Sequence, residues 1–334
     1  MRRPTIIDIA RRVGVSKAAV SYALNGRYGV SSKTRERVLE VASELGWHAS
    51  SAARALSKDR SGSVGIVLAR PPEVLRTEPY FLQLLSGLEQ TLSAHAVSLQ
   101  LAMVADRDAE LATYRRWWAE RRVDGFVLTD LRVPDPRPAL VRELGAPTVL
   151  FGARGRTPGI PGLRTAERRD VLAALEHLAA RGHRRIGHVR GSGNLQHTQR
   201  RARAISRAAR DLLGTEVLQA DGGYTEEGGV SATRALLAAE PPPTAIIYDN
   251  DVMAVAAVAN AEDLGVRVPA DLAVLAWDDS ILCRVVRPPV TAFAHDIAAD
   301  GTTVARMLLE LIETGTTEEA EYSPRTLVPR ASTG

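Results

Sequence analysis

Residues 5–26 read TIIDIARRVGVSKAAVSYALNG and predict two short helices joined by a tight turn. Thr5 and Asp8 have the spacing of an N-terminal capping pair, and the apolar residues after them recur at helical intervals as far as Gly14. A second helix starts at Ser16, whose hydroxyl can accept a hydrogen bond from a free backbone amide. Two helices tied by so short a glycine-containing turn are typical of a helix-turn-helix.

A third helix is predicted over about residues 32–45, and it would close a three-helix unit. Its apolar side chains share one stripe, which consists of Val38, Leu39, Ala42 and Leu45. A plain fragment of a helical bundle shows the same spacing. The pattern therefore favours DNA binding by this segment and leaves a purely structural role open.

Positive charge is concentrated in the same segment. Residues 1–60 hold 12 lysines and arginines against 5 acidic residues, a balance of +7, whereas the rest of the chain holds 31 against 34, or −3. Cations gathered on one small unit suit the phosphate backbone of nucleic acid, because binding there releases condensed counterions. A solvated charged face would have the same composition, so charge alone does not decide between the two.

Four stretches of this basic unit resemble the DNA-binding headpiece of the LacI/GalR family of bacterial transcription regulators. They read TIIDIA at 5–10, GVSKAAVSYALNG at 14–26, VSSKTRERV at 30–38 and AARAL at 52–56. The resemblance implies that residues 16–25 form a recognition helix that lies in the major groove. It also implies contacts to phosphate, which fix the register of the protein on the duplex, from Thr5, Ser16, Ser21 and Asn25.

Lys17 and Ala18 occupy the leading, base-reading positions of this implied recognition helix. A lysine there can donate hydrogen bonds to guanine O6 or N7, whereas an alanine can offer only a methyl contact, for example to thymine. Tyr22 belongs to the same DNA-binding set and stands where many members of the family carry arginine. The operator sequence that this combination selects therefore stays open.

Residues 49–58 are rich in alanine, the best helix former, yet the stretch is short. Isolated helices of fewer than about 12–15 residues are marginal in water, so we expect a helix that forms only conditionally. In the family this segment is a hinge helix, and two copies in a dimer enter the minor groove with a leucine wedged into the central base step. The matching residue here is Leu56, while Ser50 replaces the asparagine common at its position.

The wedge implied for Leu56 leads to a testable prediction. Apolar wedges unstack a base step and kink the duplex, and added protein contacts stabilise the bend. Replacing Leu56 with alanine should therefore reduce DNA bending and operator affinity, both measured by gel shift, and leave the ligand affinity of the isolated body intact. Equal operator affinities for variant and parent would count against the wedge.

The pattern of residues 62–334 differs from that of the headpiece. Short apolar runs alternate with amphipathic segments, such as 82–94, 171–181 and 251–264. This alternation predicts an α/β fold of parallel sheets with helices on both faces. The expected strands lie at 64–68, 98–102, 125–128, 148–151, 185–189, 245–248, 272–276 and near 325–329.

These βα units are too many for one sheet. Two doubly wound subdomains are therefore expected, with a ligand cleft at the carboxyl ends of their strands. The stretches GHRRIG (182–187), DNDVMA (249–254) and LAWDD (275–279) resemble landmarks of the family's periplasmic-binding-protein-like body. The expected domains are a headpiece, a hinge with linker, and a body, over residues 1–48, 49–61 and 62–334. Within the body, the first subdomain would hold about 62–161 and 291–320, and the second about 162–290 and 321–334.

An arginine, an asparagine and an aspartate that converge from three strand ends suit sugar hydroxyls, because each can fix two hydroxyl groups while aromatic faces cover the ring. The resemblance assigns these places to Arg201, Asn250 and Asp278. The other candidates are aromatic or follow a strand, and they are Tyr80, Phe81, Thr129, Asp130 and Tyr224. Aspartates after strands are also common turn caps, and Tyr80 and Phe81 would equally suit a core.

These expectations describe a homodimeric, sequence-specific DNA-binding regulator in the cytoplasm, a repressor of carbohydrate uptake or catabolism that leaves operator DNA when a sugar-like effector binds. One alternative is a corepressor type whose DNA binding is tightened by a purine or a sugar phosphate. Another is a solute-binding protein without a role on DNA.

Other classes of function are disfavoured by what the sequence lacks. The single cysteine, Cys283, excludes an internal disulfide framework and a cysteine-based zinc site, and neither a metal nor a cofactor is expected. No Ser-His-Asp or paired-carboxylate arrangement suggests an enzyme. The longest apolar run, 252–259, is well short of the ~18 residues that a membrane helix needs, so no membrane association is expected.

Overall fold

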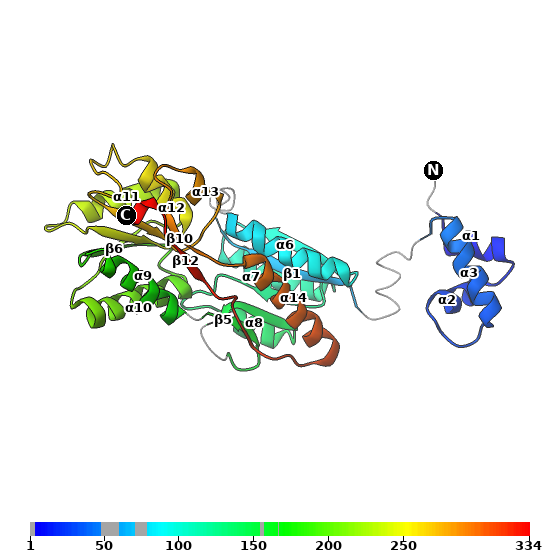
Figure 1. The fold of residues 1–334 in the computed structure, drawn as a ribbon. Coiled ribbons are helices and arrows are strands. Elements are labelled where there is room, and N and C mark those ends of the chain that lie inside the picture. Colours follow the sequence, from blue (N-terminus) through cyan, green and yellow to red (C-terminus); the bar gives the residue numbers. More distant parts are fainter. Residues whose placement is uncertain (1–3, 48–59, 71–78, 154–156, 166) are drawn as a thin grey trace. The chain divides into compact units, whose positions relative to one another are not determined.

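The computed structural model describes residues 4–47, 60–70, 79–153, 157–165 and 167–334 (Figure 1). The chain divides into two compact units, Met1–Ser61 and Gly62–Gly334, which we call the headpiece unit and the body. Ser50 and Leu56, and with them the expected hinge helix, lie outside the described residues.

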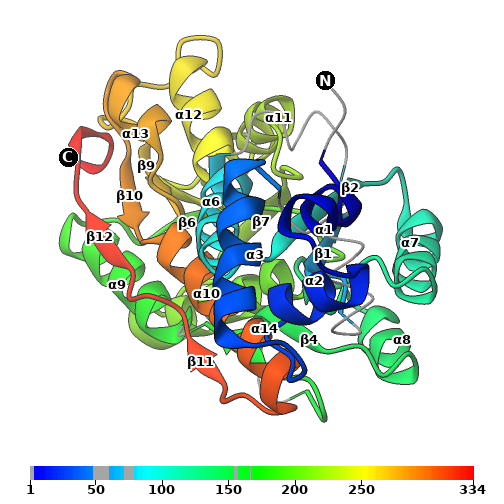
Figure 2. The ribbon, with the colours of Figure 1, turned by 90° about the vertical axis from the view of Figure 1, so that its right-hand side faces the viewer.

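The described residues of the headpiece unit form three helices, which Figure 2 shows in blue. They are α1 (Ile6–Val13), α2 (Lys17–Leu24) and α3 (Ser32–Glu44). Each contributes apolar side chains to one small core, whose fully buried members are Ile9, Val20, Val38 and Val41. The spacing of these residues places them on the facing sides of the helices, so the helix-turn-helix prediction is confirmed.

The ends of the first two helices are where the sequence predicts them. The backbone amide and the hydroxyl of Thr5 both donate to the Asp8 carboxylate, over 2.8 and 2.6 Å. Gly14 ends α1 with a left-handed φ of 79°, which a glycine adopts without steric cost. The hydroxyl of Ser16 then accepts a hydrogen bond from the amide of Ala19 and caps α2.

The first sheet of the body has six strands in the order β11-β5-β4-β3-β1-β2, and every neighbouring pair is parallel. The strands are β1 (Ser63–Leu68), β2 (Ser98–Met103), β3 (Phe126–Leu128), β4 (Thr148–Ala153), β5 (Gly162–Arg164) and β11 (Ala320–Glu321). Helices α6 (Pro79–Ala94) and α14 (Ile297–Thr314) pack on one face. Helices α7 (Arg107–Ala119) and α8 (Arg137–Glu143) pack on the other.

The second sheet has the order β12-β10-β9-β8-β6-β7, and only β12 runs antiparallel to its neighbour. Its strands are β6 (Ile186–Arg190), β7 (Leu218–Asp221), β8 (Ala245–Tyr248), β9 (Ala273–Ala276), β10 (Thr291–Ala294) and β12 (Thr326–Val328). Helices α9 (Glu167–Ala180) and α10 (Gln196–Leu213) cover one face. Helices α11 (Glu226–Leu237), α12 (Asp251–Ala259) and α13 (Ile281–Val285) cover the other.

The chain changes subdomain a few residues later than the sequence suggests. β5 pairs with β4, so residues 162–164 belong to the first sheet and not to the second. β10 pairs with β9, so the return to the first subdomain follows Ala294 and does not begin at residue 291. Strand pairing sets both of these subdomain boundaries. Segments as short as β5 and β10 have no hydrophobic periodicity from which the pairing could be predicted.

No helix in the described part of the chain is both long and apolar enough to cross a membrane.

Candidate functional site

The residues expected to read DNA lie on the exposed side of α2. Lys17 and Ala18 are exposed in its first turn, and Tyr22 is 41% exposed one turn later. Val20 and Ala23 point into the headpiece core. Because no residue of α2 is acidic, this side presents a cation, a methyl group and an aromatic ring with no negative charge on the same helix.

Three of the residues expected to contact phosphate, Thr5, Ser16 and Asn25, flank helix ends, and Ser21 lies within α2. In the protein alone, their side chains bond locally: Thr5 donates to Asp8, and the amide nitrogen of Asn25 donates to the backbone oxygen of Ser21 over 2.9 Å. The hydroxyl of Ser16 accepts from a backbone amide, so its proton stays available for a phosphate oxygen. These positions are therefore held in place before any DNA is bound.

Tyr28 is a further candidate for DNA contact that the sequence analysis missed. It lies in the turn between α2 and α3 and is 99% exposed. The next residue, Gly29, has a φ of 113°, and a Cβ there would come within 3.2 Å of the Tyr22 ring. The sequence did contain a signal for this residue, because Tyr28 stands next to Gly29, whose positive φ is part of the turn.

A cavity lies in the body and is lined by residues of both subdomains. Its polar lining comes largely from the carboxyl ends of strands: Asp130 follows β3, Asp249 follows β8, and Asp278 follows β9. Ligands bind at such strand ends in doubly wound folds. Seven of the eight expected effector residues line this cavity, and they are Tyr80, Phe81, Thr129, Asp130, Arg201, Tyr224 and Asp278.

Arg201 and Asp249 form a buried ion pair in the wall of the cavity. One guanidinium nitrogen of Arg201 lies 2.9 Å from the carboxylate of Asp249 and 3.1 Å from its backbone oxygen. His188 and the amide of Gly191 donate to the same carboxylate over 2.9 and 2.8 Å. Burial disfavours the charged carboxylate, but these partners outweigh it and hold the pKa of Asp249 well below its usual value.

The face of the Arg201 guanidinium lies on an aromatic ring. Its central carbon is 4.6 Å from the centroid of the Trp277 ring, and Trp277 is almost fully buried. Stacking on the ring and the pair with Asp249 leave Arg201 little rotational freedom. Nε of Arg201 also lies 3.4 Å from the carboxylate of Glu167, so this part of the wall is held on several sides.

Arg70 and Asp130 form a second pair, on the side of the first subdomain. Two guanidinium nitrogens of Arg70 donate to the two carboxylate oxygens over 2.6 and 2.8 Å. The Arg70 guanidinium also lies 5.0 Å from the ring centroid of Phe81 and 5.1 Å from that of Tyr224. Burial opposes ionisation of Asp130, but the charge of Arg70 prevails and lowers the pKa of Asp130.

Tyr224 and His197 meet at the edge of the cavity. The hydroxyl of Tyr224 is 2.8 Å from His197 Nε2 and 2.9 Å from the hydroxyl of Thr198. Burial lowers the pKa of His197 to about 3, so its imidazole is neutral at physiological pH. Tyr224 is 3% exposed, which makes it a fixed wall residue in this arrangement of the chain.

Asp278 contacts residues 322–325, which connect β11 of the first sheet to β12 of the second and which we call the crossing segment. Arg325, which comes just before β12, donates to the Asp278 carboxylate over 3.1 Å and to the backbone oxygen of Trp277 over 2.7 Å. Tyr322 lies nearby, with its ring centroid 5.0 Å from that of Phe151. The crossing segment therefore completes the cavity with a cation and an aromatic ring.

Several polar atoms of the lining are buried and make no hydrogen bond within the described structure. They are the hydroxyls of Thr129 and Thr165, both terminal nitrogens of Arg200, and Nε of Arg201. Buried polar atoms are usually satisfied by a protein group or by a bound molecule. A ligand rich in hydroxyl groups would satisfy these donors.

Asn250 is the one expected effector residue that does not line the cavity. Its side-chain oxygen accepts from the amide of Met253 over 3.0 Å, so Asn250 caps α12. It is 1% exposed, and its amide nitrogen points to the backbone oxygen of Tyr224. The neighbouring Asp249 takes the position in the wall, and Asn250 supports that wall from behind.

More than half of the lining residues were not predicted from the sequence. Asp249 and Trp277 are immediate neighbours of expected residues, so proximity in the motif could have indicated them. Arg70 and Phe151 stand at the ends of expected strands, so the rule for strand ends could have indicated them too. Glu167, His197, Tyr322 and Arg325 had no such signal. Nowhere in the described residues do three or more histidine, cysteine, aspartate or glutamate side chains gather so as to hold a metal ion.

Comparisons with known proteins match both units. Residues 5–50 match the family described as bacterial regulatory proteins of the lacI family, and residues 175–333 match a periplasmic binding protein-like domain. The HTH-type transcriptional regulator CelR of Thermobifida fusca is 32% identical over 325 residues, which cover 95% of this chain and 94% of that protein.

Two solved structures have the same fold over nearly the whole length. A complex of the transcriptional regulator CelR with cellobiose has a TM-score of 0.74 at 28% identity and covers 99% of this chain and all of that one. A Lac repressor dimer bound to operator has a TM-score of 0.84 at 24% identity, covers 99% of each chain, and supports the fold alone. With the headpiece and the cleft both present, the chain belongs to the LacI family of bacterial helix-turn-helix transcriptional regulators.

Proposed function

We propose that this protein is a homodimeric repressor of carbohydrate uptake or catabolism genes, which a sugar-like effector releases from its operator. In this assignment residues 1–48 bind DNA, residues 49–61 form the hinge, and residues 62–334 bind the effector and dimerise. A regulator that acts on the bacterial chromosome works in the cytoplasm, and no catalytic step is part of the assignment.

The observation that carries the sugar assignment is the set of unbonded polar atoms in a cavity that also has aromatic walls. Threonine hydroxyls and guanidinium nitrogens can bond sugar hydroxyls, while Tyr80 and Phe81 supply apolar surface for the ring. CelR, whose complex with cellobiose has this fold, is a relative with a sugar in its structure.

Charge in the cavity favours a neutral ligand over a purine or sugar phosphate that acts as a corepressor. Four arginines line it, and they are Arg70, Arg200, Arg201 and Arg325. Each lies within 4 Å of a carboxylate, and five acidic residues line the same space: Asp130, Glu167, Asp170, Asp249 and Asp278. A phosphate group would need unpaired cations, which the described lining does not provide.

A thermal-shift screen of the full chain against mono- and disaccharides, cellobiose included, tests the effector class. A sugar at about 100 times its Kd adds about 2.7 kcal/mol to the folded state. The melting temperature should rise by roughly 5 °C or more, at about 2–4 °C per kcal/mol. Purines and sugar phosphates are the comparison arm, and stabilisation by these compounds but by no free sugar would reverse the assignment.

The role on DNA is tested by gel shift with promoter fragments from the protein's own genome against random competitor at low salt. We expect selective binding that the stabilising sugar weakens. Selective binding that the ligand strengthens would support the corepressor type. Equal binding to promoter and random DNA would leave only a solute-binding role.

A further inference from the structure

The loop between β3 and α8, residues 129–136, connects three parts of the body. It begins in the cavity with Thr129 and Asp130. Asp130 has a φ of 50°, a left-handed conformation that costs free energy in a residue with a side chain. Such strain persists only where surrounding contacts hold it, and here Arg70 holds the side chain and Arg137 donates to the backbone oxygen over 2.8 Å.

The middle of this loop is hydrogen-bonded to the second subdomain. The amide of Val133 donates to the backbone oxygen of Asn194 over 2.9 Å. The amide of Gln196 donates to the backbone oxygen of Leu131 over 2.7 Å. The side chain of Gln196 donates to the backbone oxygen of Arg132 over 2.9 Å. One of these bonds joins the β3–α8 loop to Asn194, just before α10, and two join it to Gln196 in the first turn of α10. The same helix carries Arg201.

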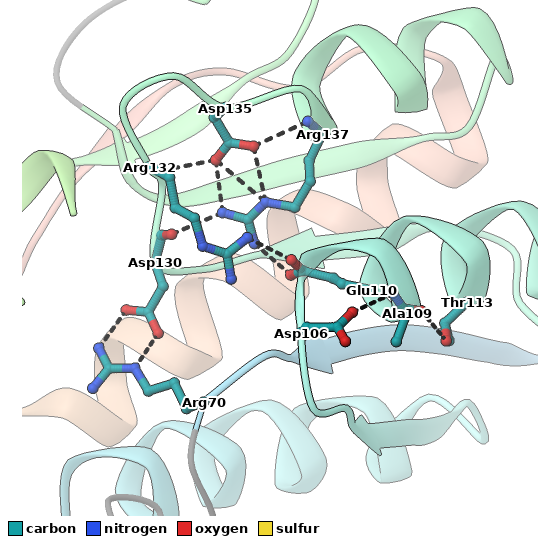
Figure 3. A network of polar contacts seen from close by, with 9 residues as sticks. All are labelled: Arg70, Asp106, Ala109, Glu110, Thr113, Asp130, Arg132, Asp135 and Arg137. Carbon is teal, nitrogen blue, oxygen red and sulfur yellow. Dashed lines mark hydrogen bonds and ion pairs between the residues drawn. The ribbon is translucent and has the colours of Figure 1, made fainter. Parts of the chain in front are cut away.

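Glu110 of α7 holds the same loop from behind, as Figure 3 shows. Its carboxylate is fully buried and accepts from Arg132 over 2.5 Å and from Arg137 over 2.8 Å. Asp135 accepts from the amide of Arg132 and from the Arg137 side chain, so the loop is also closed on itself. One buried carboxylate thus orients Arg132 of the loop and Arg137 at the start of α8.

We propose that Glu110 and Gln196 are positioning residues for the effector response, with the β3–α8 loop as the bridge between the two subdomains. Neither residue lines the cavity. The loop bonds hold the two subdomains in one relative position. A ligand that touches both subdomains favours the same position. Whatever weakens the loop bonds must therefore weaken ligand binding, and ligand must in turn strengthen the loop bonds. The ligand part of this inference rests on the proposed function.

The main test compares two glutamines of α10. Gln196 and Gln199 each donate one side-chain hydrogen bond to a backbone oxygen, but Gln199 bonds to Gly193 within its own subdomain. In the ligand-free full chain, Gln196→Ala should speed hydrogen exchange at the amide of Val133 about fivefold, the factor expected for one hydrogen bond. Gln199→Ala should leave that rate unchanged. Equal rates in the two variants would overturn the proposal.

A second pair of variants tests Glu110. Glu110→Gln keeps the shape of the side chain but removes the charge that Arg132 and the buried Arg137 share. Glu120→Gln alters an exposed pair with Arg122 just after the same helix. Exchange at Val133 should rise in the first variant and not in the second. If Glu110→Gln does not fold, Gln196→Ala still decides the question.

The ligand arm uses cellobiose, or the sugar that gives the largest thermal shift. Its Kd for Gln196→Ala should be about fivefold higher than for Gln199→Ala, and saturating sugar should slow exchange at Val133 in the parent. An unchanged Kd beside faster exchange would overturn the coupling. If no sugar binds the parent, the proposed effector class is wrong, and the ligand-free exchange rates still decide whether the loop is the bridge.

Discussion

Replacing Asp249 with asparagine is expected to lower the free energy of unfolding of the body by about 3–5 kcal/mol, the usual result of removing one partner from a buried ion pair. Three donors surround the carboxylate: His188, Gly191 and Arg201. In either orientation, an asparagine places its own NH₂ group against one of them and leaves the Arg201 charge unpaired. Urea denaturation of the body at pH 7 measures the difference.

The same substitution should change the dependence of stability on pH. The pKa of Asp249 in the folded protein lies below its unfolded value of about 3.9, so the carboxylate stabilises the fold above about pH 4. This contribution is lost as the pH falls toward the folded pKa, because the unfolded chain binds the proton more readily. The difference between parent and Asp249→Asn should therefore shrink steadily below about pH 4.

Asp221 offers a matched control in the same sheet. It pairs with Arg190 over 2.8 Å, but its side chain is 58% exposed. Water already solvates such a pair, so Asp221→Asn should leave the denaturation midpoint close to that of the parent. If the two variants had similar midpoints, burial of the Asp249 cluster would not be a source of stability.

Local chemistry explains which parts of the fold could be predicted from the sequence. The first two headpiece helices begin at bonds between residues of one turn: the Asp8 carboxylate accepts from the amide of Thr5, and the hydroxyl of Ser16 accepts from the amide of Ala19. Neighbouring residues therefore define these ends. The long buried strands of both sheets have apolar runs. By contrast, β7 at the edge of its sheet is largely exposed, and its sequence LQAD has no apolar run that would distinguish it from a loop.

The cavity shows why the rest could not be predicted. Thr129 and Asp278 follow strands, so the rule for strand ends finds them. Arg70 pairs with a residue 60 positions away, and Arg325 with one 47 positions away, so only the packed fold reveals these partners. Asn250 was assigned to the ligand by the resemblance, whereas its side chain is used to cap α12. Of two adjacent residues in this motif, Asp249 lines the cavity and Asn250 caps the helix behind it, and the motif alone does not show which residue does which.

Lys17→Ala is expected to weaken operator binding by about 1–3 kcal/mol, because a lysine at the start of a recognition helix can read guanine directly. Lys17 is exposed in the first turn of α2, away from the headpiece core, so its loss should leave the fold intact. Gel shifts on operator and on random DNA, at several salt concentrations, separate base reading from phosphate attraction. The loss should be greater on operator than on random DNA.

Lys33→Ala is the matched control, since it removes the same charge from the exposed N-terminal turn of α3. A lysine that only attracts phosphate weakens binding to all sequences alike and lowers the salt dependence by about one counterion. If Lys17→Ala behaved in this way too, Lys17 would be a phosphate contact. Selectivity would then rest on Ala18 and Tyr22, the other exposed side chains of α2.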